Sequence, residues 1–153
     1  MEFRLEGVIP ALLTPFTAGG AEVDCDKLRG LVSHLVSQGV HGVFPCGTTG
    51  EGMLMSVDER KKVIEEVVAE AAGRITVIAH TGSFDTATTI ALTRHAQEAG
   101  AAAAGIVTPG FYGYDNAALT AHFKAIAAAV PGFPILLYNI PGCARNHLSP
   151  DLV

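Results

Sequence analysis

Charged residues are scarce in this sequence of 153 residues. They make up 16% of the chain, whereas hydrophobic residues make up 49%. An average globular protein has about 25% charged residues. A disordered segment would show the opposite composition, with low hydrophobicity and a high net charge. The sequence therefore predicts a folded protein in which much of the chain is buried on more than one side.

Several classes of protein are disfavoured by features that the sequence lacks. The net charge is −5, so the basic surface that nucleic acids bind is missing. No apolar run reaches the roughly 18 residues that a membrane span requires. The three cysteines, Cys25, Cys46 and Cys143, are odd in number and show no Cys-x-x-Cys spacing, so we expect neither disulfides nor a zinc site. Without a signal-peptide pattern, we expect a cytoplasmic protein with no nucleic-acid or membrane partner.

Strand-like and helical segments alternate along the chain. Five short apolar runs have the length of strands and are continuous rather than alternating, as in parallel strands that are covered on both faces. These runs are Gly7–Leu13, Gly39–Pro45, Ile75–Ala79, Ala103–Val107 and Pro134–Tyr138. The segments between them have the period of helices. Capping residues are expected at Asp24 and in the capping box Ser56-Val57-Asp58-Glu59.

The spacing of the strands leaves two architectures open. Strand starts recur about every 30 residues, which is the length of one βα unit. Five units fit an open doubly wound sheet, which 153 residues would complete. They also fit the first part of a (β/α)₈ barrel, which needs about 250 residues. Length alone favours the open sheet.

Polar residues collect at the carboxyl end of every expected strand, which is the working face in both architectures. The motifs are Thr14-Pro15-Phe16, Gly47-Thr48-Thr49-Gly50-Glu51, His80-Thr81-Gly82, Thr108-Pro109-Gly110-Phe111-Tyr112 and Tyr138-Asn139-Ile140-Pro141-Gly142. The Gly-Thr-Thr-Gly-Glu segment has the glycines, hydroxyls and amides that suit a small carboxylate, although an ordinary glycine-rich loop has the same pattern. Tyr138 can relay protons in a cleft or can be a rim tyrosine with a hydrogen-bonded hydroxyl.

Two other residues near these motifs are given supporting roles: His80 is interpreted either as a packing residue or as one that supports the site residues from behind, and Cys46 is interpreted as a packing residue. His80 is the only histidine that ends an expected strand, and the sequence has no pair of histidines at metal-ligand spacing. Cys46 precedes the Gly-Thr-Thr loop without a visible base partner, so we expect it to pack as a small hydrophobic residue. We therefore predict no metal and no cofactor.

Taken together, these motifs resemble the dihydrodipicolinate synthase and N-acetylneuraminate lyase family. The resemblance rests on Gly47-Thr48-Thr49-Gly50-Glu51, Thr108-Pro109 and Tyr138-Asn139-Ile140-Pro141, in this order and spacing, and on the opening segment Ile9–Phe16. It implies a (β/α)₈ barrel and a class I aldolase that forms a Schiff base between a lysine and pyruvate or another 2-oxo acid. It also implies a homo-oligomer, either a dimer or a tetramer.

The resemblance assigns roles to individual residues. Gly47, Thr48 and Thr49 match the loop that holds the pyruvyl carboxylate, and Thr49 also matches the relay threonine. Tyr138 matches the tyrosine that moves protons over the imine. Tyr112 and Arg145 are expected to contribute to substrate binding.

Two positions depart from the pattern of the synthases. Phe111 stands where a second relay tyrosine is expected, with Tyr112 adjacent, and Cys143 stands where an arginine is expected, with Arg145 two residues later. Phenylalanine cannot relay a proton. A 2-keto-3-deoxy sugar acid aldolase or dehydratase, or an enzyme similar to N-acetylneuraminate lyase, is therefore an alternative to a strict dihydrodipicolinate synthase.

The lysine that forms the Schiff base is not among these residues. In the family it ends the sixth strand, whereas Lys27, Lys61, Lys62 and Lys124 all lie in segments with helical period. We therefore expect residues 1–153 to be the amino-terminal portion of one barrel domain, with about five βα units and no activity alone. A non-catalytic relative that binds 2-oxo acids and an independent open-sheet binding domain remain as alternatives.

Overall fold

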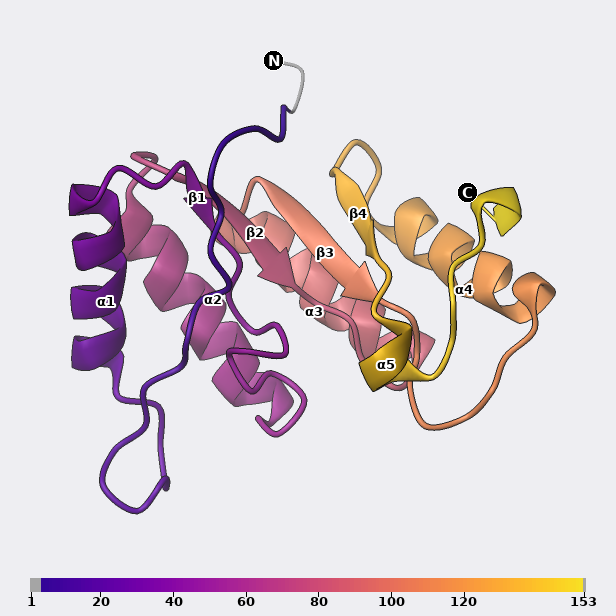
Figure 1. Cartoon of the computed structure of the whole chain (residues 1–153), viewed down its shortest axis with the longest axis horizontal. Coiled ribbons are helices and arrows are strands. Elements are labelled where there is room, and N and C mark those ends of the chain that lie inside the picture. Colours follow the sequence, from indigo (N-terminus) through magenta and orange to yellow (C-terminus); the bar gives the residue numbers. More distant parts are fainter. Residues whose placement is uncertain (1–3, 153) are drawn as a thin grey trace.

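The computed structural model describes residues 4–152, which form a four-stranded parallel sheet. Its strands are β1 (Gly42–Val43), β2 (Thr76–His80), β3 (Ala103–Val107) and β4 (Ile135–Tyr138). They lie in the order β1-β2-β3-β4 (Figure 1), which is also their order in the chain. A doubly wound sheet reverses its strand order at a switch point, whereas the strands of a (β/α)₈ barrel follow one another around it. The observed order is that of the barrel.

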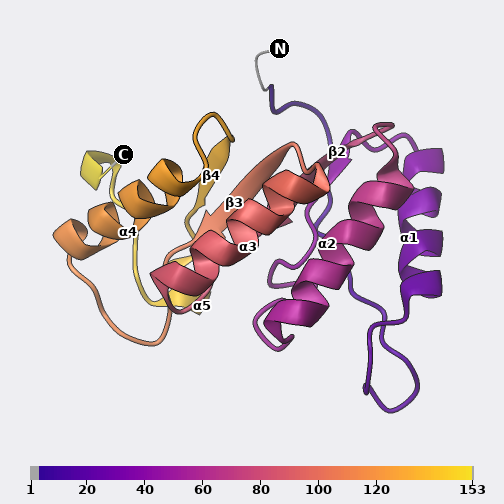
Figure 2. The same cartoon turned by 180° about the vertical axis from the view of Figure 1, so that it is seen from behind.

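Four helices cover one face of the sheet (Figures 1 and 2). They are α1 (Cys25–Ser37), α2 (Val57–Ala71), α3 (Thr86–Ala99) and α4 (Asn116–Ala129). Each helix packs against the next one in the chain. A doubly wound fold would place helices on both faces, so this one-sided arrangement also favours the barrel over the open sheet that the length suggested.

The helices begin at side chains that satisfy free backbone amides. The predicted cap at Asp24 is confirmed, because its carboxylate accepts from the amide of Lys27 at 3.1 Å. The predicted capping box is confirmed as well: the amide of Ser56 donates to the carboxylate of Glu59 at 2.8 Å, and the amide of Glu59 donates to the hydroxyl of Ser56 at 3.2 Å. Local sequence therefore determines where these helices start.

The prediction of a strand over Gly7–Leu13 was wrong in its extent. This segment lies beside β1, and the amide of Phe44 donates to Pro10 O while the amide of Leu12 donates to Phe44 O, both at 3.0 Å. Only one isolated bridge, Ala11 to Phe44, forms between the two segments. Proline has no N–H to donate, so the ladder is interrupted at Pro10.

The carboxyl-terminal segment contains only short helical turns among the described residues. Residues Pro150–Leu152 form a single 3₁₀ turn, η1, and Val153 lies outside the described residues. A short helix that was not predicted, α5 (Pro141–Ala144), follows β4. Between residues 4 and 152, no helix has the length and apolar character needed to cross a bilayer.

The hydrophobic core lies between the helices and the sheet. Leu28 and Val32 of α1 and Ile64 and Val67 of α2 are fully buried, and they belong to the same cluster as Val43 of β1. Each such side chain stabilises the fold by roughly 1.5–3 kcal/mol relative to an exposed position. This packing leaves the carboxyl ends of the strands as the place where polar groups meet.

Candidate functional site

A cavity of about 370 Å³ lies at the carboxyl ends of the strands. Residues from the loops after all four strands line it: Thr48, Met53, His80, Phe84, Thr108, Phe111, Cys143 and Arg145 are among them. In an α/β barrel, this end of the sheet is where substrates bind. The cavity is the candidate site because polar groups from loops that are distant in sequence converge on it.

The structure brings some of the predicted site residues to this cavity and leaves others beside it. Thr48 and Arg145 line it, whereas Gly47, Thr49 and Tyr138 are not among its lining residues. Tyr138 is close, because its ring lies edge-on to the ring of His80 with 6.1 Å between centroids. Tyr112 lines a neighbouring cavity of about 280 Å³, together with Phe84, Gly110, Phe111 and Tyr114.

Hydrogen bonds and close backbone contacts hold the Gly-Thr-Thr loop in place. The hydroxyl of Thr14 donates to Gly50 O at 2.7 Å, and the amide of Gly52 donates to Gly47 O at 3.1 Å. A Cβ atom at Gly50 would lie 2.6 Å from Leu12 O, and one at Gly52 would overlap the carbonyl group of Cys46. Thr48 and Thr49 are exposed at the tip of this loop, so their hydroxyls are accessible to a ligand.

Four residues other than glycine have positive φ angles in the loops at the carboxyl ends of the strands, and two of them, Phe111 and Arg145, line the cavity. Cys46, Glu51, Phe111 and Arg145 have φ values of 61°, 57°, 69° and 62°. Such conformations cost roughly 1–3 kcal/mol each and persist where the surrounding structure enforces them. All four residues lie in loops that follow strands, and the one other such residue among residues 4–152, Ala72, ends α2, so most of this backbone strain lies near the candidate site.

Arg60 of α2 is a residue of this site that the sequence analysis missed. Only 3% of its surface is exposed. Its Nη1 donates to Gly82 O at 2.9 Å, its Nη2 donates to His80 O at 2.8 Å, and the same Nη2 lies 3.3 Å from His80 Nδ1. Among residues 4–152, no carboxylate forms an ion pair with this guanidinium. A buried positive charge therefore lies directly behind the cavity.

Burial changes the acid–base behaviour of two groups near Arg60. Together with the smaller effect of the charge of Arg60, it lowers the pKa of His80 to about 3. It raises the pKa of the Cys46 thiol to about 12, against a smaller opposing effect of Arg60. His80 is therefore a neutral imidazole at physiological pH. Cys46 is a fully buried, protonated thiol, as its interpretation as a packing residue requires.

Asn146 is a second residue that the sequence analysis missed. Its side-chain amide donates to Pro109 O at 2.6 Å and to Tyr112 O at 2.8 Å, and its Oδ1 accepts from the amide of Tyr114 at 2.8 Å. These bonds tie the loop after β4 to the loop after β3. Asn146 therefore fixes the position of Arg145 relative to Phe111 across the cavity mouth.

Comparison with known proteins identifies the family. Residues 4–153 match the model of the Dihydrodipicolinate synthetase family. The chain belongs to this family.

Relatives and solved structures of the family match nearly the whole chain. A 4-hydroxy-tetrahydrodipicolinate synthase from Sorangium cellulosum is 49% identical over 98% of the chain and 50% of its own length. The dihydrodipicolinate synthase of Aquifex aeolicus superposes with a TM-score of 0.92 at 42% identity, over 97% of the chain and 50% of that structure. The enzyme from Acinetobacter baumannii, complexed with pyruvate, gives a TM-score of 0.91 at 40% identity, with the same coverage. The chain spans about half the length of the relatives it matches.

The four lysines of this family member lie on helices. Lys27 is on α1, Lys61 and Lys62 are on α2, and Lys124 is on α4. None of them lines the cavity at the carboxyl ends of the strands. Within residues 4–152, no cluster of three or more histidine, cysteine, aspartate or glutamate residues is arranged to hold a metal ion.

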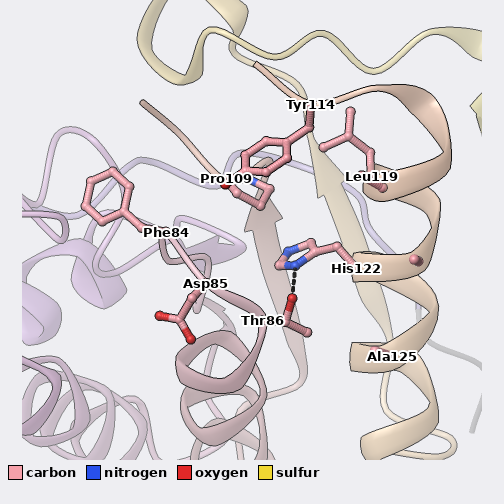
Figure 3. A pocket seen from close by; sticks show the side chains of 10 residues that line it. Phe84, Asp85, Thr86, Pro109, Tyr114, Leu119, His122 and Ala125 are labelled. Carbon is pink, nitrogen blue, oxygen red and sulfur yellow. Dashed lines mark hydrogen bonds between the residues drawn. The ribbon is translucent and has the colours of Figure 1, made fainter. Parts of the chain in front are cut away.

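A larger cavity of about 500 Å³ lies between α3 and α4 (Figure 3). Its polar centre is a hydrogen bond of 2.9 Å between Thr86 Oγ1 and His122 Nδ1, and Phe84, Asp85 and Tyr114 surround it. Burial lowers the pKa of His122, while Asp85 opposes this change. None of the predicted site residues lines this cavity, so we do not assign it to the family's chemistry.

Proposed function

We propose that this chain is the amino-terminal part of the barrel of a lysine Schiff-base aldolase or lyase that acts on pyruvate or a related 2-oxo acid. The amine of a lysine outside these residues would attack the ketone carbon of the 2-oxo acid, and water would leave as the imine forms. The protonated imine then withdraws electrons, so that an enamine can form and attack or release an aldehyde. This chain would supply the binding and proton-relay groups, and it would be inactive alone.

The observation that carries this proposal is the cavity at the carboxyl ends of the strands, which combines hydroxyl groups with positive charge. Thr48 and Arg145 line it, and the guanidinium of Arg60 lies behind it. A small carboxylate is stabilised by hydroxyl and amide donors and by nearby cations. We assign Gly47, Thr48 and Thr49 to the carboxylate of the 2-oxo acid, and Arg145 and Tyr112 to the second substrate.

The proton relay is proposed for Tyr138 and Thr49. Tyr138 ends β4, and its ring lies edge-on to Phe44 and His80, with centroids 5.6 Å and 6.1 Å away. These contacts hold the ring at the edge of the cavity. The proposed relay therefore needs no rearrangement of the strand that carries the tyrosine.

A sibling aldolase or dehydratase is the second candidate function, and Phe111 and Cys143 favour it. Both residues line the cavity, and neither can relay a proton or pair with a carboxylate as the residues expected there would. An electrophile without a carboxylate, such as a hydroxyaldehyde, suits this lining better. A relative that binds 2-oxo acids without catalysis is the remaining alternative.

Assembly into a homodimer or homotetramer in the cytoplasm is part of the proposal. Phe84, Phe111 and Tyr112 are exposed next to the cavity. Exposed aromatic side chains that cluster in this way are typical of protein interfaces.

The test is the intact mass of the polypeptide that carries residues 1–153, measured before and after borohydride treatment with pyruvate. We expect a mass well above 15.9 kDa and the addition of one reduced pyruvyl group. Tyr138→Phe should slow trapping at least about 100-fold, while Thr120→Val, on the outer helix α4, should not change it. A polypeptide that binds pyruvate without forming an adduct would establish the non-catalytic alternative. Condensation with a hydroxyaldehyde, but not with an aldehyde that carries a carboxylate, would establish the sibling enzyme.

A further inference from the structure

A positively charged side chain without an anionic partner is unusual in a protein interior. Arg60 is nearly fully buried, and its two terminal nitrogens are bound to the carbonyl groups of His80 and Gly82. Both carbonyl groups belong to the turn at the carboxyl end of β2. Helix capping does not require this arrangement, because Ser56 and Glu59 already complete the capping box of α2. The guanidinium therefore has another role at the end of this strand.

The guanidinium determines which nitrogen of His80 carries the proton. Arg60 Nη2 lies 3.3 Å from His80 Nδ1. A guanidinium can only donate hydrogen bonds, so Nδ1 must accept. The proton of the neutral imidazole then lies on Nε2. A cationic imidazole would place a second positive charge beside Arg60, and the lowered pKa of His80 agrees with the neutral form.

The other nitrogen of His80, Nε2, belongs to a ring that lines the cavity, although only 2% of the residue is exposed to solvent. His80 lines the cavity at the carboxyl ends of the strands. Within the described part of the chain, no hydrogen bond of Nε2 is 3.5 Å or shorter, although the backbone of Cys46 also has a small effect on the imidazole, and a Cβ atom at Gly82 would lie 3.2 Å from Nε2. Glycine at position 82 allows the close approach of Val107, whose nearest atoms would lie 2.9 Å from that Cβ atom, and it also keeps a side chain away from Nε2. The rings of Phe44 and Tyr138 contact the imidazole edge-on and fix its plane.

We propose that Arg60 is a positioning residue that holds His80 as the Nε2–H tautomer, and that His80 donates this hydrogen bond to an oxygen atom of the bound 2-oxo acid. The proposal rests on the function proposed above and adds a substrate-binding residue to it. It also explains why Arg60 is buried without a carboxylate: a carboxylate would neutralise the positive charge behind a site that receives an anion. The charge and the fixed donor act together on the same ligand.

The tautomer is tested by ¹⁵N NMR of the histidine side chains in the polypeptide that carries residues 1–153. At neutral pH, we expect His80 to show a protonated Nε2 and an unprotonated Nδ1. In Arg60→Met the two tautomers should mix, while Arg94→Met, a change of the same kind on the exposed side of α3, should leave the spectrum of His80 unchanged. A protonated Nδ1 or an imidazolium in the unmodified protein would overturn the proposal, even if Arg60→Met fails to fold.

The hydrogen bond to the ligand is tested by the pyruvate concentration that gives half-maximal borohydride trapping. His80→Phe should raise this concentration about tenfold, which is the contribution of one hydrogen bond. His80→Gln, whose side-chain amide can replace the Nε2–H donor, should restore it to within about threefold. His34→Phe, an exposed change on α1, is the control. An unchanged half-maximal concentration in His80→Phe, with normal trapping, would overturn the proposal. Absence of trapping in the unmodified protein would instead overturn the proposed function, and the NMR result would still decide the tautomer.

Discussion

The two ends of the sheet reverse the direction of the chain with different residues. At the amino end, where helices lead into strands, a glycine with positive φ follows each helix: Gly39, Gly73, Gly100 and Gly132. Glycine adopts this conformation without steric cost. At the carboxyl end, positive φ angles occur at Gly19 and Gly20, but most fall on residues other than glycine: Cys46, Glu51, Phe111 and Arg145. Apart from Ala72, which ends α2 with φ of 47°, this conformation is therefore relaxed at the amino end, whereas at the carboxyl end it falls mostly on strained residues.

The turns at the amino end only connect a helix to the next strand, whereas the loops at the carboxyl end also position the side chains of the site. A Cβ atom at Gly39, Gly73 or Gly132 would meet nothing within 4 Å, whereas one at Gly50 or Gly52 would meet backbone atoms. These three turns have space and use glycine for its φ angle alone. The carboxyl end is crowded because its loops enclose the cavity. Substitutions at the two ends should accordingly have different effects.

The largest effect is expected for Gly52→Ala at the crowded end. The new Cβ atom would overlap the carbonyl group of Cys46, and neither backbone segment can move without breaking the bond between Gly52 and Gly47. We expect no folded protein in the soluble fraction, as judged by circular dichroism. The counterpart at the open end, Gly132→Ala, should yield folded protein. Equal yields of the two variants would show that the ends do not differ in this way.

The second largest effect is expected from His80, at the carboxyl end of β2. Its burial should make the protein less stable in acid. The pKa of His80 is about 3 in the folded protein and 6.5 for an unperturbed histidine. Between these values the unfolded chain binds a proton that the folded chain does not, so the free energy of unfolding decreases as the pH falls from 6.5 to 3. The decrease should reach roughly 4 kcal/mol.

This pH dependence is measured by urea denaturation of the unmodified protein and of His80→Gln at several pH values. The variant should lose less stability in acid, whatever its stability at neutral pH. His34→Gln, an exposed change near the end of α1, should keep the slope of the unmodified protein. Parallel curves for the unmodified protein and His80→Gln would contradict the assignment.

A smaller effect is expected when a relaxed turn is strained. Gly132→Ala places a Cβ atom on a residue with φ of 77°, and this atom would have no neighbour within 4 Å. The only cost is therefore the unfavourable backbone conformation of alanine at positive φ. It should lower the free energy of unfolding by about 1–2 kcal/mol, measured by urea denaturation. Gly30→Ala inside α1, which also has free space, should raise it by about 1 kcal/mol. A loss in both variants would point to packing rather than to φ.

The smallest effect is expected when a strained loop is relaxed. Glu51 has φ of 57° and an exposed side chain. Glu51→Gly should raise the free energy of unfolding by roughly 0.5 kcal/mol, because relief of strain slightly exceeds the added entropy of the unfolded chain. The thermal midpoint should rise accordingly. A lower midpoint would mean that the glutamate side chain stabilises the loop.

Features that depend on neighbouring residues in the sequence could be predicted, and features that depend on distant ones could not. The caps at Asp24 and Ser56 were predicted because capping is local. The strand predicted over Gly7–Leu13 was too long, because one proline within an apolar run interrupts the hydrogen bonds between neighbouring strands. The strand order, which distinguishes the barrel from the open sheet, follows only from how the units pack.

The same distinction holds at the candidate site. Thr48 and Arg145 were predicted from motifs and line the cavity. Arg60 was missed because it follows Asp58 and Glu59 and precedes two lysines, a pattern typical of a solvated helix face. Its burial depends on the carbonyl groups at the end of β2, about 20 residues away. Asn146 was missed because its partners lie in the loop after β3.

The strand order has a consequence for synthesis on the ribosome. Each strand pairs with the strand made just before it, and each helix packs against its predecessor. No strand of this sheet has to wait for a partner that is encoded later, so the sheet can grow from β1 to β4 as the chain emerges. Folding can then follow translation one βα unit at a time, and each new unit covers the hydrophobic edge left by the unit before it.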